Sequence, residues 1–244
     1  MTFKLAVAQS KQDTVWGCEY KELSSSEDIG KVHVCMVNIS DLKKIATELV
    51  TRIQDTSWIT NLDEGAKRTY NKTAAQTAAA LVKIFNATLD TNQIGKEFGE
   101  IMVSIGSAQA LKEIFDHHIL PIAELWKPQV KQNEGFDFHT VCTSKYINFG
   151  EAKFSSKKSP HGNAIDQAKG FIEDEKHFRD RPHLREFVSK EALDNLDGDS
   201  YGVVASFSVN ASNPLTVLKN AVYSAEESFK CEKIKSIYLV GVKH

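Results

Sequence analysis

The chain has no long hydrophobic run. Across its 244 residues, no stretch approaches the about 20 apolar residues that a membrane-spanning helix needs. Residues 1–10 hold one lysine and a very short apolar segment, too short for the core of a secretory leader, and they indicate a first strand instead. We therefore expect a cytoplasmic protein that does not associate with membranes.

Cysteines are few and scattered. The four thiols belong to Cys18, Cys35, Cys142 and Cys231, and none lies within four residues of another. Zinc sites of the common types bring cysteine or histidine ligands in closely spaced pairs, so the pattern excludes them. We expect reduced thiols, most of them buried in the core.

The chain also lacks a basic excess. It has 30 Lys and Arg against 32 Asp and Glu, a formal net charge of -2. A protein that holds nucleic acid unaided usually shows an overall basic excess or a clear basic stripe. If nucleic acid is the substrate, either the basic groups are gathered locally or another subunit supplies most of the affinity.

The composition is otherwise that of a globular protein. Hydrophobic residues make up 41% and charged residues 25%, and the length suits one large domain or a core with an appendage. Such a chain buries a sizeable core without disulfides or structural metals. A soft boundary near residues 86–92 divides an N-terminal β/helical region, 1–90, from a core, 91–244.

The N-terminal region is predicted to contain strands followed by helices. Residues 1–40 are rich in β-formers, with a strand over 31–39 after a turn at 24–30. Either Ser40 or Asp41 is expected to cap the first helix. Helices are expected from there to Ile53, over 65–89, from near Thr91 through Ile105, and over about 108–126 with an interruption near Pro121.

The pattern changes after residue 126. Strands are expected over 135–142, 145–154, 201–209 and 234–242, and helices over 163–175 and 214–229. The last strand, helix and strand form a βαβ-like unit, for which we expect parallel pairing.

One acidic-x-Lys triplet stands out by its context. Glu151-Ala-Lys153 lies within a predicted strand, whereas the triplets at 19–21, 41–43 and 174–176 are what chance would give. On a strand, Glu151 and Lys153 point to the same face, which begins with apolar residues. Burying such charges is costly unless they are paired or bind a metal.

A second acid is expected close to this triplet. Asp137 stands alone in an apolar strand, and two antiparallel strands joined by a short turn would bring it near Glu151. Two ionised carboxylates repel, and a divalent cation resolves the conflict. Oxygen ligands suit Mg²⁺ or Mn²⁺, which can activate a water for attack on phosphorus. Lys153 could orient that water or stabilise the transition state.

These motifs resemble the PD-(D/E)xK nuclease signature, an acid on one strand followed by Glu-x-Lys on the next. The resemblance covers about residues 91–180 and implies a restriction-endonuclease-like α/β core, a central mixed sheet flanked by helices in the order αβββαβ, here with the N-terminal extension. The family often adds a Glu from the preceding helix and a Gln from the following one. Glu100, with Glu97 one turn earlier, and Gln167 are the candidates. Phe136 stands where Pro often precedes the Asp.

The Gly-Glu helix, the Asp-Phe-His strand and the Gly-Glu-Ala-Lys-Phe strand are more specifically similar to the HamA family of Hachiman-type antiphage defence pairs. That resemblance implies a metal-dependent DNA nuclease that works with a superfamily-2 helicase, a HamB-like subunit. Region 1–90 is the expected docking region for that partner. The alternative is a catalytically silent binding or regulatory subunit of a nucleic-acid-processing complex.

The remaining polar candidates surround the predicted site. Lys157, Lys158 and His161 follow the Glu-x-Lys strand in a loop suited to phosphate contacts. His139 alternates to the face of Asp137, although an ordinary strand histidine is the simpler interpretation. His117 and His118 are adjacent, so on a helix they point about 100° apart and rarely share a ligand.

Overall fold

The computed structural model describes residues 3–91, 94–126 and 135–244. The strands in these ranges are β1 (Leu5–Asp13), β2 (Cys18–Ser25), β3 (Val32–Ile39), β4 (His118–Ile119), β5 (Phe138–Val141), β6 (Ile147–Lys153), β7 (Tyr201–Ser208) and β8 (Ile234–Lys243). The α-helices are α1 (Leu42–Gln54), α2 (Glu64–Thr91), α3 (Lys96–Phe115), α4 (Ala123–Trp126), α5 (His161–Glu173), α6 (Lys176–Leu184), α7 (Lys190–Asp197) and α8 (Pro214–Ser228). A short 3₁₀ helix, η1 (Ser57–Asn61), joins α1 to α2.

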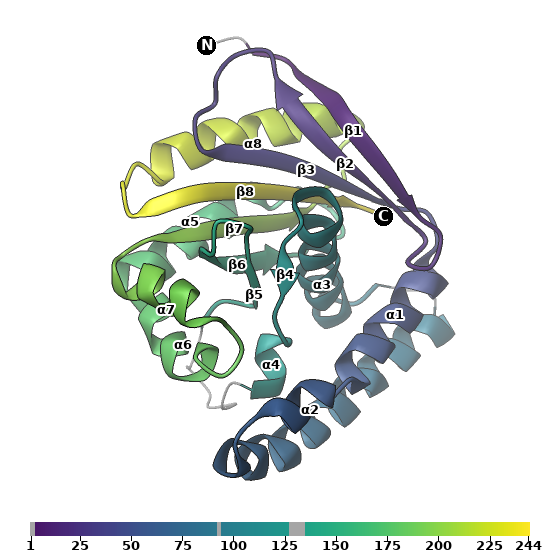
Figure 1. Ribbon diagram of the computed structural model, residues 1–244. Helices are drawn as coiled ribbons and strands as arrows, with labels where there is room; N and C mark the ends of the chain where they lie inside the picture. The colour runs from purple at the N-terminus through teal and green to yellow at the C-terminus, as the bar shows by residue number, and fades with distance from the viewer. Residues whose placement is uncertain (1–2, 92–93, 127–134) are drawn as a thin grey trace.

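The strands form one mixed, curled sheet in the order β1-β2-β3-β8-β7-β6-β5-β4 (Figure 1). Strands β3, β8, β7 and β6 run parallel in the middle, and antiparallel pairs complete both sides. Every residue of β7 is buried, as expected for a central parallel strand covered on both faces. The structure therefore confirms an α/β protein with a mixed sheet flanked by helices.

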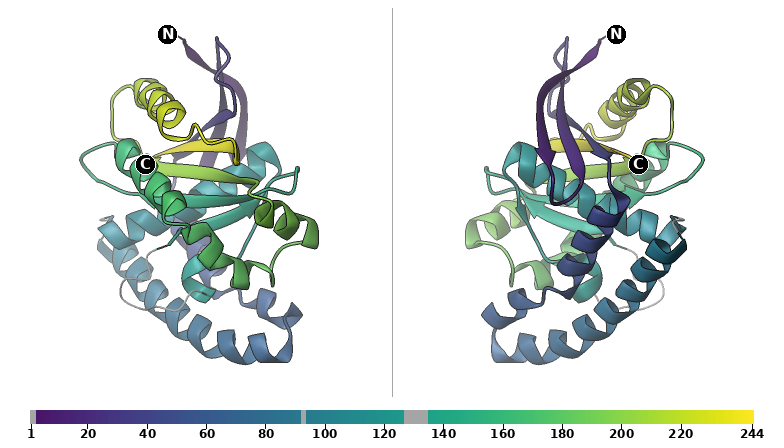
Figure 2. Two further views of the ribbon diagram at one scale, coloured as in Figure 1. Left: turned by 90° about the vertical axis from the view of Figure 1, so that its left-hand side faces the viewer. Right: turned by 90° about the vertical axis from the view of Figure 1, so that its right-hand side faces the viewer.

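Helices cover both faces of the sheet (Figure 2). Helices α5 and α8 pack together on one face, and α3 lies across the other. Every residue of α3 from Phe98 to Leu111 except Glu100 is buried, so α3 serves as the central core helix rather than a surface helix. The long helix α2 runs at the bottom of Figure 1 and contacts α1, α3 and α4.

Local sequence signals explain where several helices begin. Asp41, not Ser40, caps α1, because its carboxylate accepts hydrogen bonds from the amides of Lys43 and Lys44. Asn213 caps α8, where Pro214 occupies the first turn at no hydrogen-bonding cost. These caps place both helices close to their predicted ranges.

The prediction of a fourth helix over 108–126 is wrong. Helix α3 continues through residue 108 and ends at Asp116, whose φ of 56° places it in the left-handed region. His118 and Ile119 then pair with β5 as the edge strand β4, and only the last four residues return to a helix, α4. The segment pairs with the edge of β5, and its own apolar periodicity does not predict this pairing.

The β-rich character of residues 1–40 is confirmed, with β2 as a strand that we did not delimit from sequence. The parallel pairing predicted for the last βαβ unit is also confirmed, since β7 and β8 are parallel neighbours. Strand β3 pairs with β8, so the sheet continues across the sequence boundary at residues 90 and 91. In the ranges described above, no helix is long and apolar enough to cross a membrane.

Candidate active site

The antiparallel pair β5–β6 brings Asp137 beside Glu151. Phe138 faces Gly150 in the strand register, and Asp137 immediately precedes β5. The amide of Asp137 donates to the carbonyl of Gly150 over 2.8 Å, and its Oδ2 accepts from the amide of Ala152 over 2.7 Å. These two bonds hold the Asp137 carboxylate against the backbone that carries Glu151.

Gly150 permits this close arrangement. A Cβ built at Gly150 would overlap the ring of Phe138, which is itself 4% exposed. A side chain at position 150 would therefore push Phe138 or the strand away. The glycine immediately before Glu151 is thus part of how the two acids are placed.

Glu151 and Lys153 form an ion pair, as their alternation along β6 predicts. Lys153 Nζ lies 2.5 Å from Glu151 Oε1, and the two side chains are 22% and 1% exposed. Phe154, the residue after β6, packs against Gly99 of α3 instead. An almost fully buried carboxylate with one lysine partner is an uncommon and costly arrangement.

The surroundings oppose ionisation of Glu151. Burial, and then the negative charge of Asp137, raise the pKa of Glu151 well above its ordinary value, and Lys153 offsets them only in part. Partial burial lowers the pKa of Lys153, but the charges of Glu151, Asp137 and Glu100 outweigh it and raise that pKa overall. Because Lys153 keeps some solvent contact, we take it as the charged partner and Glu151 as the group whose charge is poorly accommodated.

An acidic cavity adjoins this pair. It has a volume of about 170 Å³, and its polar lining consists of Glu97, Glu100, Ser104, Glu124 and Asp137. Leu81 and Ile84 of α2 supply part of its apolar wall. Asp137 connects the two features, because it lines the cavity and also acts on the pKa of Glu151.

The structure brings Glu100 and Glu97 into this cavity, as the resemblance implies for Glu100. A Cβ at Gly99 would overlap the ring of Phe154, so α3 approaches the end of β6 very closely at this point. The close approach places Glu100 near the ion pair, where its charge contributes to the pKa of both partners.

Glu124 and Ser104 were not singled out from the sequence. Both line the cavity, Glu124 from the short helix α4 and Ser104 from the buried part of α3. Glu124 lies in the apolar segment Ile-Ala-Glu-Leu-Trp, 122–126. A lone acid among apolar residues is the same signal that identified Asp137, and it could have identified Glu124.

Two other predictions lie apart from this cluster. Gln167 is on α5, and its side chain makes no hydrogen bond within the part of the chain that the structure describes. Lys157 and Lys158 are exposed in the loop before α5, and His161 is partly buried at the start of that helix. Asn210 stabilises this loop by donating to the carbonyls of Ser155 and Lys158.

The buried histidines His117 and His139 each have a hydrogen-bonding partner. Nε2 of His139 lies 2.9 Å from Asp180 Oδ2, and Nδ1 of His117 lies 2.9 Å from the hydroxyl of Thr140. His118 is exposed on the edge strand β4. The ordinary interpretation of His139 as a buried strand histidine agrees with these contacts.

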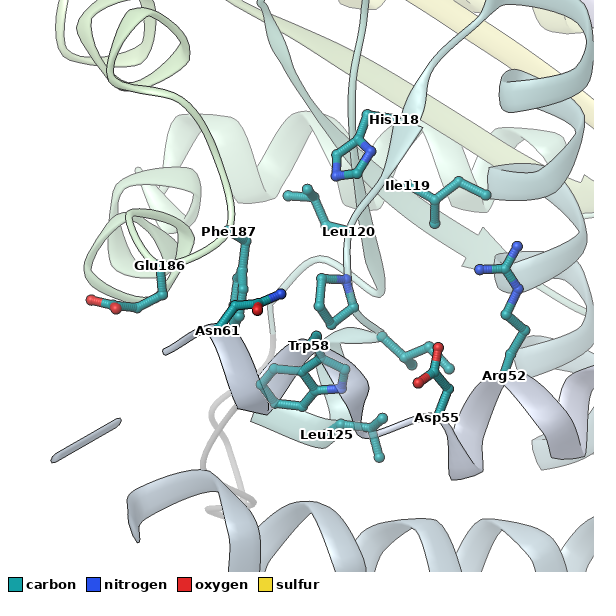
Figure 3. Close-up of a pocket in the computed structure, with 12 residues that line it drawn as sticks. Arg52, Asp55, Trp58, Asn61, His118, Ile119, Leu120, Leu125, Glu186 and Phe187 are labelled. Carbon is teal, nitrogen blue, oxygen red and sulfur yellow. The ribbon is translucent and has the colours of Figure 1, made fainter. Parts of the chain in front are cut away.

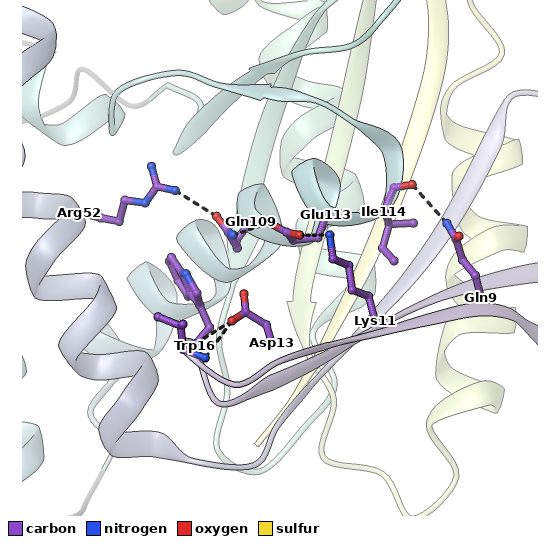
Figure 4. A network of polar contacts seen from close by, with 9 residues as sticks. Gln9, Lys11, Asp13, Trp16, Arg52, Gln109, Glu113 and Ile114 are labelled. Carbon is purple, nitrogen blue, oxygen red and sulfur yellow. Dashed lines mark hydrogen bonds and ion pairs between the residues drawn. The ribbon is translucent and has the colours of Figure 1, made fainter.

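A polar network holds α3 in place (Figure 4). Arg52 of α1 donates to Gln109 over 3.2 Å, Gln109 donates to Glu113 over 2.9 Å, and Lys11 of β1 pairs with Glu113 over 2.5 Å. Three elements are thereby joined through one face of α3. The same helix carries Glu100 two to three turns earlier, so the network helps to fix the acid that enters the cavity.

A larger hollow is lined mainly by residues of α1, η1 and the segment 118–125 (Figure 3). It has a volume of about 300 Å³, and its lining includes Arg52, Asp55, Trp58, Glu186 and Phe187. One cation and two carboxylates face it without a buried acid–lysine pair. The smaller cavity, in contrast, is lined by Asp137 and Glu100, whose charges act on Glu151.

The donor set of the site fits a hydrated divalent cation better than a fully protein-bound one. Among the residues that the structure describes, no three His, Cys, Asp or Glu side chains are close enough to hold a metal ion. In the same ranges, Glu151 Oε2 and the hydroxyl of Ser104 are buried without a hydrogen-bond partner. Mg²⁺ usually keeps several waters and takes only one or two carboxylates, which Asp137 and Glu151 could supply.

Comparison with known proteins identifies no relative. No protein-family model, curated protein or solved structure matches this chain. The geometry of the residues themselves is therefore the basis for assigning a function.

The raised pKa of Glu151 predicts a distinctive pH dependence of stability. An acid whose pKa is higher in the folded chain takes up a proton on folding between its unfolded and folded pKa values. In EDTA, lowering the pH from neutral toward about 4.3, the ordinary Glu value, should stabilise the wild type relative to Glu151→Gln. That relative gain is complete below the ordinary value and is lost as the pH rises through the raised pKa.

Thermal unfolding of both proteins across this pH range measures the effect. Each unit of pKa elevation corresponds to about 1.4 kcal/mol of relative stability. Glu173→Gln, at an exposed site on α5, is the matched control. A melting-temperature difference between wild type and Glu151→Gln that stays constant with pH would contradict the prediction.

Proposed function

We propose that this chain is a metal-dependent nuclease that hydrolyses DNA phosphodiester bonds on a restriction-endonuclease-like core. The observation that carries the proposal is the buried Glu151–Lys153 ion pair beside Asp137. The order α3, β4, β5, β6, α5 and β7, with α4, α6 and α7 between them, also supports the αβββαβ order of PD-(D/E)xK proteins. Glu100 lines the acidic cavity, which supports its proposed role as the helix acid, whereas Gln167 has only its place on α5 in its favour.

The proposed chemistry assigns a role to each side chain. Asp137 and Glu151 would hold Mg²⁺ or Mn²⁺ through carboxylate oxygens, with Glu100 acting from the cavity wall. When bound, such a cation polarises a phosphoryl oxygen and lowers the pKa of a coordinated water. Lys153 keeps its proton, so its ammonium can orient the attacking water and stabilise negative charge on the phosphorane-like transition state.

The local charge of the site supports a role for a cation. Phosphate approaching Asp137, Glu100, Glu97 and Glu124 would meet like charge. A divalent cation removes this repulsion and relieves the unfavourable ionisation of Glu151 at the same time. The same ion would thus stabilise the folded chain and allow the substrate phosphate to approach the carboxylates.

We further propose that the chain is the effector of a bacterial antiphage defence complex with a superfamily-2 helicase of the HamB type. The net charge of -2 favours a partner that contributes to DNA binding. A nuclease free in the cytoplasm would damage its host, which favours control by that partner. The alternative, a catalytically silent binding or regulatory subunit, has the net charge in its favour but leaves the buried acid–lysine pair unexplained.

A metal titration distinguishes these two functions. A cation that binds only the folded chain stabilises it by RT ln(1 + [L]/Kd), about 2.7 kcal/mol at a hundredfold excess over Kd. We expect the melting temperature to rise with Mg²⁺ or Mn²⁺ in the wild type and not in Glu151→Gln. Glu173→Gln, an exposed matched control, should respond as the wild type does. No shift at millimolar metal would favour the silent subunit.

A further inference from the structure

The outer face of α2 is basic, although the chain as a whole is not. Between Glu64 and Asp90 the helix has Lys67, Arg68, Lys72 and Lys83 and no acidic residue. Arg68, Lys72 and Lys83 are exposed, and in the described chain none of the three forms an ion pair. Unpaired basic residues on one face of a helix form a local basic surface, which the near-neutral net charge of the chain does not exclude.

These three side chains share one stripe. At 100° per residue, they lie within about 60° of one another around the helix axis. At 1.5 Å per residue, they span about 22 Å along it. The intervening exposed residues are small or polar, among them Asn71, Gln76 and Ala79. The stripe therefore lacks the apolar centre expected of a protein-docking helix.

The opposite face of α2 leads to the candidate active site. Leu81 and Ile84 line the acidic cavity, and Lys83 lies between them in sequence on the outward side. Phosphates near the cavity are repelled by its carboxylates, so cations at its margin are needed to hold a strand there. Lys83 is adjacent to Ile84 in sequence and about 100° from it around the helix, so the Lys83 end of the stripe is the end nearest the cavity wall.

We propose that the Arg68–Lys72–Lys83 stripe of α2 binds the phosphate backbone of the nucleic acid and leads it to the acidic cavity. This inference rests on the proposed nuclease function and adds the surface that holds the substrate. A span of about 22 Å corresponds to about six nucleotides along one strand at 3.4 Å each. Contacts of this kind position the backbone and carry no sequence preference.

The test compares two charge-reversed proteins that have the same change in net charge at different places on the surface. The first is R68E/K72E/K83E. The second, K4E/K230E/K235E, has the same net charge change on exposed lysines that precede β1, follow α8 and lie in β8, elements that lie away from α2 in Figure 1. Binding of a short labelled single-stranded DNA, and of its duplex, is followed by fluorescence anisotropy in EDTA at several salt concentrations. Circular dichroism and thermal unfolding verify that both proteins are folded.

We expect the α2 variant to lose at least about tenfold in affinity at low salt and the slope of log K against log salt to fall by about 2 to 3. The control variant should stay within about twofold of the wild type. The two probes show whether single strands or duplexes are preferred. Equal losses in both variants would mean a general charge effect and would overturn the proposal.

Two further outcomes also overturn it. If R68E/K72E/K83E binds as the wild type does, α2 is not the substrate surface, and an acidic protein partner becomes the better occupant. If the wild type binds neither probe, the stripe does not hold nucleic acid. Cleavage is assayed separately. If the α2 variant alone loses binding but the wild type never cleaves DNA, the nucleic-acid-binding surface on α2 is supported and the nuclease function is contradicted.

Discussion

Replacing Glu151 by Gln should reduce DNA hydrolysis by at least about a hundredfold while the protein stays folded. The amide retains the shape of the side chain and removes the charge that would bind the cation. It also separates Lys153 from its ion-pair partner, 2.5 Å away in the wild type. Initial rates of plasmid nicking with Mg²⁺ or Mn²⁺ measure the effect, and far-ultraviolet circular dichroism checks the fold.

The matched control for this variant is Glu173→Gln. Glu173 is 65% exposed on α5 and forms only a 3.7 Å pair with Lys169, so its replacement should leave the rate unchanged. Full activity in Glu151→Gln would show that hydrolysis occurs without the buried acid. Equal losses in both variants would point to a nonspecific effect of charge.

Gly150→Ala should damage both stability and activity. The new methyl group would overlap the buried ring of Phe138, and relief requires movement of β5 against β6. Overpacking of this kind costs about 1–3 kcal/mol of unfolding free energy. Since Asp137 lies next to Phe138, the same movement displaces it from Glu151, and a shift of about 1 Å can cost about a hundredfold in rate.

Gly170→Ala provides the control for this substitution. A Cβ at Gly170, in the last turn of α5, would meet no atom within 4 Å. Alanine there should stabilise the helix by about 0.4–1 kcal/mol and leave the rate unchanged. Denaturant unfolding and nicking rates compare the two variants. A Gly150→Ala protein as stable and active as the wild type would show that the strand pair is not tightly constrained.

Local sequence patterns predicted much of the fold and the centre of the site. Strands close to β7 and β8 were predicted, and the capping residues Ser40 and Asp41 marked the start of α1. Alternation along a strand predicted that Glu151 and Lys153 share a face, and they form an ion pair. Each of these features depends on neighbours within a few residues, which is the range that sequence patterns report.

Features that depend on residues distant in the sequence were harder to predict from the sequence. The segment 118–126 became an edge strand and a short helix because β5 offered a partner, although its apolar spacing continued that of a helix. Glu124 enters the site only through that rearrangement. The contact between His139 and Asp180 joins positions 41 residues apart, and no local pattern indicates it.

The most direct test of the central claim is plasmid cleavage by the wild-type chain, alone and with a co-expressed helicase partner, in EDTA, Mg²⁺ and Mn²⁺. The proposed site predicts no hydrolysis in EDTA and nicking or degradation when a divalent cation is added, in at least one of the two preparations. Hydrolysis that persists in EDTA would contradict a metal-dependent site at Asp137 and Glu151. Absence of cleavage in every condition would contradict the nuclease itself and leave the regulatory subunit.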